Sequence, residues 1–203
     1  MKKTFSILAL VVVIASSCFY FFTSQPKNIF DEIYQETEQT YLGNNVFNKL
    51  KDVEVHKYQE YSDDSKFYPS IVYERNALPD SYEKIAIDFN FKSEAQLSLI
   101  SFEKGIESNV SIKMWTVYSH KDRTLKKSVK IGLKKADTET YIEDEAQVKS
   151  YLEQYGITAK DLDSYYDKIV NQKVLKDWCS IYDSKYSPTN YGDVKVETQW
   201  ENW

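Results

Sequence analysis

Residues 110–133 read VSIKMWTVYSHKDRTLKKSVKIGL, and this stretch decides the fold. Its first part places Val, Ile, Met, Thr and Tyr at every second position from 110 to 118. After a polar turn over 119–122, apolar side chains return at Val129, Ile131 and Leu133, with lysine and glycine between them. A period of two is that of a strand with one buried face. Two such strands joined by a short turn predict an antiparallel pair.

More strand patterns precede this pair. The clearest alternates apolar and polar residues over 85–91, and shorter β-rich runs lie over 53–56, 67–74 and 97–102. The dipeptide Lys104-Gly105 is predicted to be the turn that leads into the strand at 110. Consecutive strands with short connections predict an antiparallel meander, because parallel pairs need long crossovers.

Helices are predicted on both sides of the meander along the chain. Residues 29–42 carry an apolar stripe at helical spacing after Asn28, a candidate cap. Residues 143–155 predict a short helix, residues 158–182 a long one, and residues 194–200 a last strand. The fold class is therefore α+β: an antiparallel β-meander sheet, with an N-terminal helix and two C-terminal helices packed on one face.

Residues 1–25 are predicted to be a signal anchor or signal peptide. Lys2 and Lys3 precede residues 5–22, a charge-free and mostly apolar run close to the roughly 20 residues that span a bilayer. Two mechanisms stay open: an uncleaved anchor, or cleavage before Cys18 with lipidation of Cys18. Either one places a single α+β domain, residues 26–203, on the extracytoplasmic face of the cell membrane.

The charge balance argues against nucleic acid as a partner. The chain has 26 basic and 31 acidic residues, and two of the basic ones are Lys2 and Lys3 in the leader. The remainder, 24 basic against 31 acidic residues, carries a charge of −7. Binding to phosphate backbones needs net or clustered positive charge.

No catalytic, metal or cofactor motif is present in the sequence. His56 and His120 have no Cys or His at metal-ligand spacing, and there is no nucleophile motif and no glycine-rich phosphate loop. The acidic residues over 161–167 lack the glycine of a calcium loop and fit the solvated first turn of a helix. Cys179 has no predicted partner and is expected to be a small buried apolar residue. We therefore expect a protein that is not an enzyme and needs no cofactor.

Charge and aromatic residues are unevenly distributed. Residues 121–135 hold seven basic residues and one acidic residue, and residues 137–167 hold nine acidic and two basic residues. These runs are either solvated faces or a segregated surface that steers a charged partner. Near the C-terminus, Tyr186, Tyr191, Trp200 and Trp203 are either binding residues or core residues.

An antiparallel sheet covered by helices on one side leaves its other face free, and this face is the candidate contact surface. A one-residue register shift would exchange it for the buried face. The candidate contact residues are Asp88, Asn90, Lys113, Trp115, Lys130 and Lys134.

The C-terminal part of the chain resembles the TipC family of immunity proteins of streptococci and related Gram-positive bacteria. The resemblance rests on VLKDW (174–178), Tyr182, YSP (186–188) and YGDVKVETQWENW (191–203). The size and the N-terminal membrane segment agree with that family. No catalytic signature is carried over.

The resemblance implies a function in toxin immunity. Such proteins protect the producer and its kin from TelC-like toxins that are exported by a type VII secretion system and cleave lipid II outside the membrane. The expected partner is therefore a secreted toxin protein, which is bound so that its active site is blocked. Two alternatives stay open: a membrane-tethered binder of a lipid or cell-wall fragment, and a surface hydrolase that uses paired carboxylates.

Overall fold

The computed structural model describes residues 25–41, 49–50, 53–60, 63–73, 82–88, 96–135 and 138–203. Within these residues the sheet has eight strands, of which seven pair antiparallel with their neighbours in chain order. These seven are β1 (Val53–Glu60), β2 (Asp63–Tyr73), β3 (Tyr82–Asp88), β4 (Gln96–Glu107), β5 (Val110–Ser119), β6 (Thr124–Lys135) and β7 (Thr138–Ile142). The predicted antiparallel meander is confirmed.

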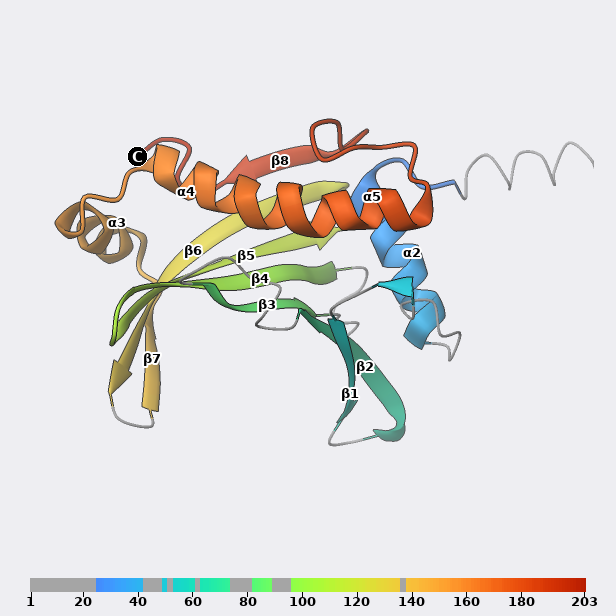
Figure 1. Cartoon of the computed structure of the whole chain (residues 1–203), viewed down its shortest axis with the longest axis horizontal. Helices are drawn as coiled ribbons and strands as arrows, with labels where there is room; N and C mark the ends of the chain where they lie inside the picture. The colour runs from blue at the N-terminus through green and yellow to red at the C-terminus, as the bar shows by residue number, and fades with distance from the viewer. Residues whose placement is uncertain are drawn as a thin grey trace, which may run out of the picture.

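The helices lie on one side of this sheet (Figure 1). They are α2 (Ile29–Tyr41), α3 (Glu145–Gln154), α4 (Ala159–Tyr166), the π-helix η3 (Asp167–Leu175) and α5 (Lys176–Tyr182). The last three form one continuous rod across the sheet, and α3 lies at its far end. The strands at the two ends of the sheet, β7 on one side and β1 and β2 on the other, bend away from the helices. The α+β fold is therefore confirmed, and the sheet curves around its helix-free side.

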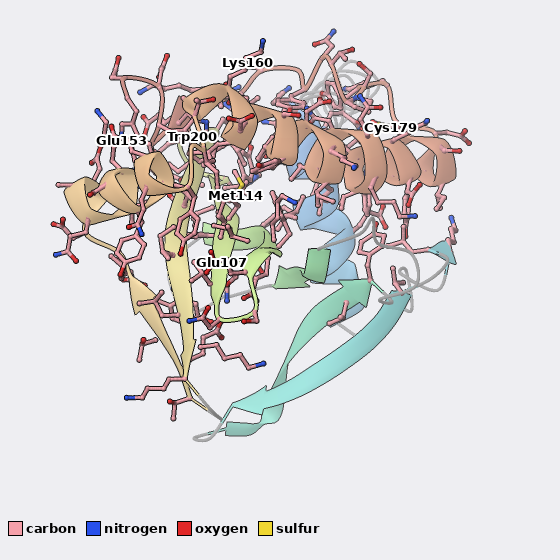
Figure 2. The ribbon with its side chains drawn as sticks, turned by 60° about the vertical axis from the view of Figure 1, so that its left-hand side comes forward. Glu107, Met114, Glu153, Lys160, Cys179 and Trp200 are labelled. Atoms are coloured by element: carbon pink, nitrogen blue, oxygen red, sulfur yellow. The ribbon has the colours of Figure 1, made fainter. Side chains whose placement is uncertain are left out.

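The core forms where the buried face of the sheet meets the helices. Along β5 every second side chain is buried, as the sequence pattern predicts. Ile112 and Met114 of β5 pair with Ile131 and Val129 of β6, and all four are at most 1 % exposed. Met114 lies between the sheet and the long helix (Figure 2). Each such side chain stabilises the fold by about 1.5–3 kcal/mol relative to an exposed one.

Three parts of the chain form hydrogen bonds along one edge of β6. The strand β8 (Lys195–Thr198) pairs parallel with residues 124–127 of β6, and β7 pairs antiparallel with residues 131–135. Between them, the backbone N–H of Val129 donates to the side chain of Gln199 at 2.9 Å. The predicted C-terminal strand is thus present. The long helix carries the chain back across the sheet, so β8 begins beside the start of β6 and runs parallel to it.

The predicted turn at Lys104-Gly105 is wrong. Strand β4 continues to Glu107, and the turn lies at residues 108–109. The pairing of β4 with β5 shifts register between Gly105 and Glu107, so Gly105 marks a bulge inside a strand. Strand β7 was not predicted, because its five residues, TETYI, show no alternation of apolar and polar side chains. In the structure, most of them are exposed.

A π-helix interrupts the predicted long helix. Its buried pairs, Ile169 with Val170 and Val174 with Leu175, recur after five residues, which suits the wider i→i+5 turn. On its other side, Asn171 accepts a hydrogen bond from the hydroxyl of Tyr191 at 2.5 Å. The wider turn therefore keeps both pairs in the core, and Asn171 fastens the C-terminal loop.

A buried carboxylate joins α2 to the sheet. Asp31 is 2 % exposed, and its Oδ1 accepts a hydrogen bond from the Tyr118 hydroxyl at 2.6 Å. The Nδ1 atom of His120 lies 2.8 Å from the same oxygen. The Asn28 side chain caps α2 by accepting from the Asp31 backbone N–H at 2.9 Å, and it donates to the Tyr118 hydroxyl at 2.8 Å. The predicted cap is confirmed, and His120 is a turn residue as expected.

No helix among the described residues is long and apolar enough to cross a membrane. The predicted membrane segment, residues 5–22, and Cys18 lie outside the described residues.

We predict that Tyr118→Phe lowers the free energy of unfolding by about 1–3 kcal/mol, because it removes the one hydroxyl that hydrogen-bonds to both Asp31 and Asn28 in the buried network. Urea denaturation of residues 26–203 measures the change. The matched control is Tyr155→Phe, whose hydroxyl is exposed and lies 3.5 Å from Glu107. Equal losses in the two variants would contradict the role of the buried network.

Candidate functional site

The candidate site is the helix-free face of β4–β7, which we call the open face. In the described part of the chain, no helix packs against it (Figure 1). Strand register sets its members, because Lys113 pairs with Lys130, Trp115 with Ser128, and Gly132 with Tyr141. Its residues are Ser101, Glu103, Ser111, Lys113, Trp115, Lys126, Ser128, Lys130, Gly132, Lys134, Glu139 and Tyr141.

The structure brings four of the six predicted contact residues together. Lys113 and Trp115 lie on β5, and Lys130 and Lys134 lie on β6. Asp88 is the last residue of β3, and its side chain is outside the described residues, as is the whole of Asn90. The prediction for these two residues therefore stays a prediction.

Lys130 is the centre of the open face. Its side chain is only 16 % exposed, and its Nζ atom lies 4.0 Å from the centre of the Tyr141 ring and 5.3 Å from that of Trp115. The same Nζ donates to Glu143 Oε1 at 2.8 Å. This hydrogen bond holds the pKa of the Glu143 carboxyl below its usual value. Lys130 is thus held by two aromatic rings and one carboxylate.

Tyr141 is the aromatic site residue that the sequence analysis missed, along with polar residues of the open face such as Glu103 and Glu139. It belongs to β7, a strand without a sequence pattern. The Nζ atom of Lys113 lies 5.3 Å from its ring, and its hydroxyl donates to Glu139. Burial and this hydrogen bond both raise the pKa of Tyr141. The only sequence signal nearby is Gly132, because a glycine inside a strand marks a close approach by a neighbour. In the structure Gly132 lies opposite Tyr141, and a Cβ at Gly132 would lie 3.5 Å from the Tyr141 ring.

An acidic pocket opens beside this cluster, between the β4–β5 turn and the β6–β7 hairpin. Its volume is about 350 Å³, and its walls include Glu103, Glu107, Glu139, Asn109 and Lys134. Glu103 is held there by a hydrogen bond of 2.5 Å from Ser111. Glu107 lies at this end of the sheet (Figure 2). The open face therefore offers ammonium groups and aromatic rings at its centre and mostly carboxylates at one end.

The basic run over 121–135 is split between the two faces of the sheet. Lys126, Lys130 and Lys134 belong to the open face. Lys127 points to the helices, where its Nζ lies 3.9 Å from the centre of the Tyr166 ring and burial lowers its pKa. Because strand residues alternate between faces, a run of lysines does not form one surface.

The aromatic residues near the C-terminus serve mainly the fold. Trp200 is 1 % exposed, and its Nε1 donates to Asp163 at 2.9 Å. Trp203 packs at the edge of the core and donates to Glu145. Tyr186 and Tyr191 donate to Pro26 and Asn171. The core interpretation of Trp200 is thus confirmed.

Two further expectations can be compared with the structure. Asp161 completes a capping box with Thr158, as expected for an acidic first turn. Cys179 is half-buried, and burial raises its pKa. Among the described residues, no three His, Cys, Asp or Glu side chains are grouped so that they could hold a metal ion.

Comparisons with known proteins agree on one family. The family model for TipC immunity protein-like proteins matches residues 2–199. The solved structure of TipC2 from Streptococcus intermedius B196 is 65 % identical in sequence, with a TM-score of 0.82. The match covers 89 % of this chain and 99 % of that one. A search of curated proteins gives no match.

We predict that Lys130→Met raises the pKa of Glu143 toward its ordinary value, because the hydrogen bond from Lys130 is the main cause of its lowering. The ion pair is therefore complete above that ordinary value and is lost as pH falls through the lowered one. An NMR titration of the Glu143 carboxyl measures the shift. Lys126→Met is the control, because Lys126 pairs with Glu197. An unchanged Glu143 titration in Lys130→Met would contradict the assigned cause.

Proposed function

The chain belongs to the TipC immunity protein-like family, and we propose that it binds an exported toxin through its open face and so protects the cell that produces it. Membership in this family makes the chain an immunity protein with a toxin as its partner. The finer proposal names the toxin as a TelC-like protein, exported by a type VII system, that cleaves lipid II outside the membrane. The immunity protein then acts by covering the toxin's active site.

The observation that carries the proposal is the cluster around Lys130 on a sheet face that no described helix covers. Aromatic rings and partly desolvated charges are typical of the residues that contribute most to protein–protein affinity. Trp115 and Tyr141 hold the ammonium group of Lys130 in place before any partner arrives. A partner that meets such preorganised groups loses less entropy on binding.

The charge pattern indicates what the toxin surface carries. Lys113 and Lys126 extend the positive centre of the open face, and Lys126 is 64 % exposed. Glu103, Glu107 and Glu139 make its end negative. A complementary partner carries carboxylates opposite the centre and a basic side chain opposite the pocket. The curvature of the sheet favours a convex partner (Figure 1).

The location follows from the target. A toxin that attacks lipid II outside the membrane is inhibited only by a protein on that side. Residues 5–22 supply the proposed membrane tether, either as an anchor helix or with lipidation at Cys18.

The alternatives are less well supported. A binder of a lipid or cell-wall fragment needs an apolar pocket in the sheet. One pocket on the described part of the open face is instead lined mainly by polar residues, among them three carboxylates, an amide and a lysine. A second, around Val117 and Lys126, is also lined mainly by polar residues. The carboxylates of the acidic pocket are candidate catalytic groups for a hydrolase, but membership in an immunity family favours inhibition over catalysis.

Binding to the toxin encoded beside the gene tests the proposal. Calorimetric titration of residues 26–203 with that toxin is combined with an assay of lipid II cleavage. Tight binding with loss of cleavage is the expected result. Absence of binding to every neighbouring exported toxin would contradict the proposed partner.

We predict that the double variant Lys126→Glu with Lys134→Glu slows association with the toxin by about tenfold at low salt, because it reverses two charges on the open face. The difference shrinks as salt screens the charges. Stopped-flow association kinetics measure it. The control is Lys160→Glu with Lys176→Glu, which changes the net charge equally on exposed helix residues. Equal slowing in both double variants would count against the open face.

A further inference from the structure

The first residues of the described domain are held firmly to its C-terminal loop. The Ile29 N–H donates to the Tyr191 carbonyl and the Asp193 N–H to the Lys27 carbonyl, each at 2.9 Å. The Tyr186 hydroxyl donates to the Pro26 carbonyl at 2.7 Å. These hydrogen bonds fix the direction in which the chain leaves the domain toward residue 24.

Asn28 and Gly192 make this attachment close. Asn28 is fully buried and donates to the Asp193 carbonyl at 2.9 Å. Gly192 has φ +91°, and a Cβ there would lie 2.7 Å from the Lys27 carbonyl oxygen. Only glycine combines this backbone angle with so close an approach. The start of the domain is thus part of its packed structure rather than a loose linker.

Little chain remains between this attachment and the proposed membrane segment. That segment ends at residue 22, and the attachment begins at Pro26. The four Cα–Cα steps from residue 22 to residue 26 span at most about 14 Å when fully extended. A domain held this closely cannot turn all of its faces toward the bilayer.

The chain leaves at one end of the long axis of the domain (Figure 1). The same end carries the turn over 120–123 and the loop over 184–193, which we together call the exit end. The turn contacts α2 through His120, and the Arg123 carbonyl accepts from the Lys195 N–H. Helix α3 lies at the opposite end. The rod from Ala159 to Tyr182 that separates the two ends is about 35 Å long at 1.5 Å per residue.

Exposed cationic side chains surround the exit end. They are Lys27, Lys121, Arg123, Lys185 and Lys195. Arg123 already pairs with Asp193 and Lys195 with Glu197, and the carboxylates of Asp122 and Asp183 are exposed beside them, so the small positive excess comes from Lys27, Lys121 and Lys185. Cations near an anionic lipid surface are attracted to it.

We propose that the exit end lies against the phosphate headgroups of the membrane and that the domain stands on it in one orientation. This inference rests on the membrane tether of the proposed function in its anchor-helix form, and it adds a direction to that tether. The long axis then points away from the bilayer, and the open face looks sideways along the membrane surface. The acidic pocket, beside the β4–β5 turn, then lies at the end of the domain that is away from the lipids. A toxin that works at the headgroups is captured from the side.

The test measures how near each end lies to the lipids. The full chain, with Cys18→Ser and Cys179→Ala, is reconstituted into mixed phosphatidylcholine–phosphatidylglycerol vesicles whose headgroups chelate nickel. A nitroxide is attached at Thr189→Cys in the exit end or at Glu153→Cys on α3, both exposed positions. We expect collisional relaxation by the lipid-bound nickel to be several-fold stronger at position 189 than at position 153.

A longer tether provides the control. Insertion of a flexible Gly–Ser segment of about twelve residues between Ser24 and Gln25 frees the domain, and the two positions then relax similarly. Equal relaxation without the insertion would overturn the fixed orientation while leaving the tether intact. Failure of this chain, which lacks the lipidation site, to float with vesicles would instead overturn the anchor helix itself, and with it this orientation. The two failures are therefore told apart by vesicle flotation.

Discussion

Burial of the Asp31 carboxylate constrains the whole structure. A carboxylate that leaves water needs several hydrogen-bond partners, and here they come from distant parts of the chain. The Lys27 backbone N–H, the Tyr118 hydroxyl and His120 all meet it. Together they fix α2 on the end of β5 and set the direction in which the N-terminal segment leaves. The helices then occupy one face of the sheet, which leaves the other face for a partner.

The two faces of the sheet have different roles in the proposed immunity function. The helix side takes the apolar residues of β5 and β6, so the alternate residues must lie on the open face. There the side chain of Lys130 is held by Tyr141, Trp115 and Glu143. In the proposed function the protein contributes a preformed surface rather than chemistry. Its selectivity for one toxin then depends on how the charges of both surfaces match.

The sequence predicted the features that follow from local periodicity. The alternation over 110–118 and 129–133 located the paired strands and assigned Lys113, Trp115, Lys130 and Lys134 to one face. Periodicity could not identify Tyr141, because β7 is an exposed edge strand whose position depends on pairing with β6. The sequence analysis also placed a turn wrongly at Gly105. Glycine is favoured both in β-bulges and in turns, so its presence alone does not distinguish the two. The π-helix and the parallel pairing of β8 with β6 depend on packing between distant segments, which one sequence does not reveal.

Site-specific photo-crosslinking tests most directly whether the toxin binds the open face. Benzoylphenylalanine is placed at Ser128 or Lys134 on the open face, and at Lys160 or Lys176 on exposed helix positions. We expect the first two positions to crosslink to the cognate toxin and the last two not to do so. Crosslinking from the helix positions, with none from Ser128 and Lys134, would contradict binding to the open face.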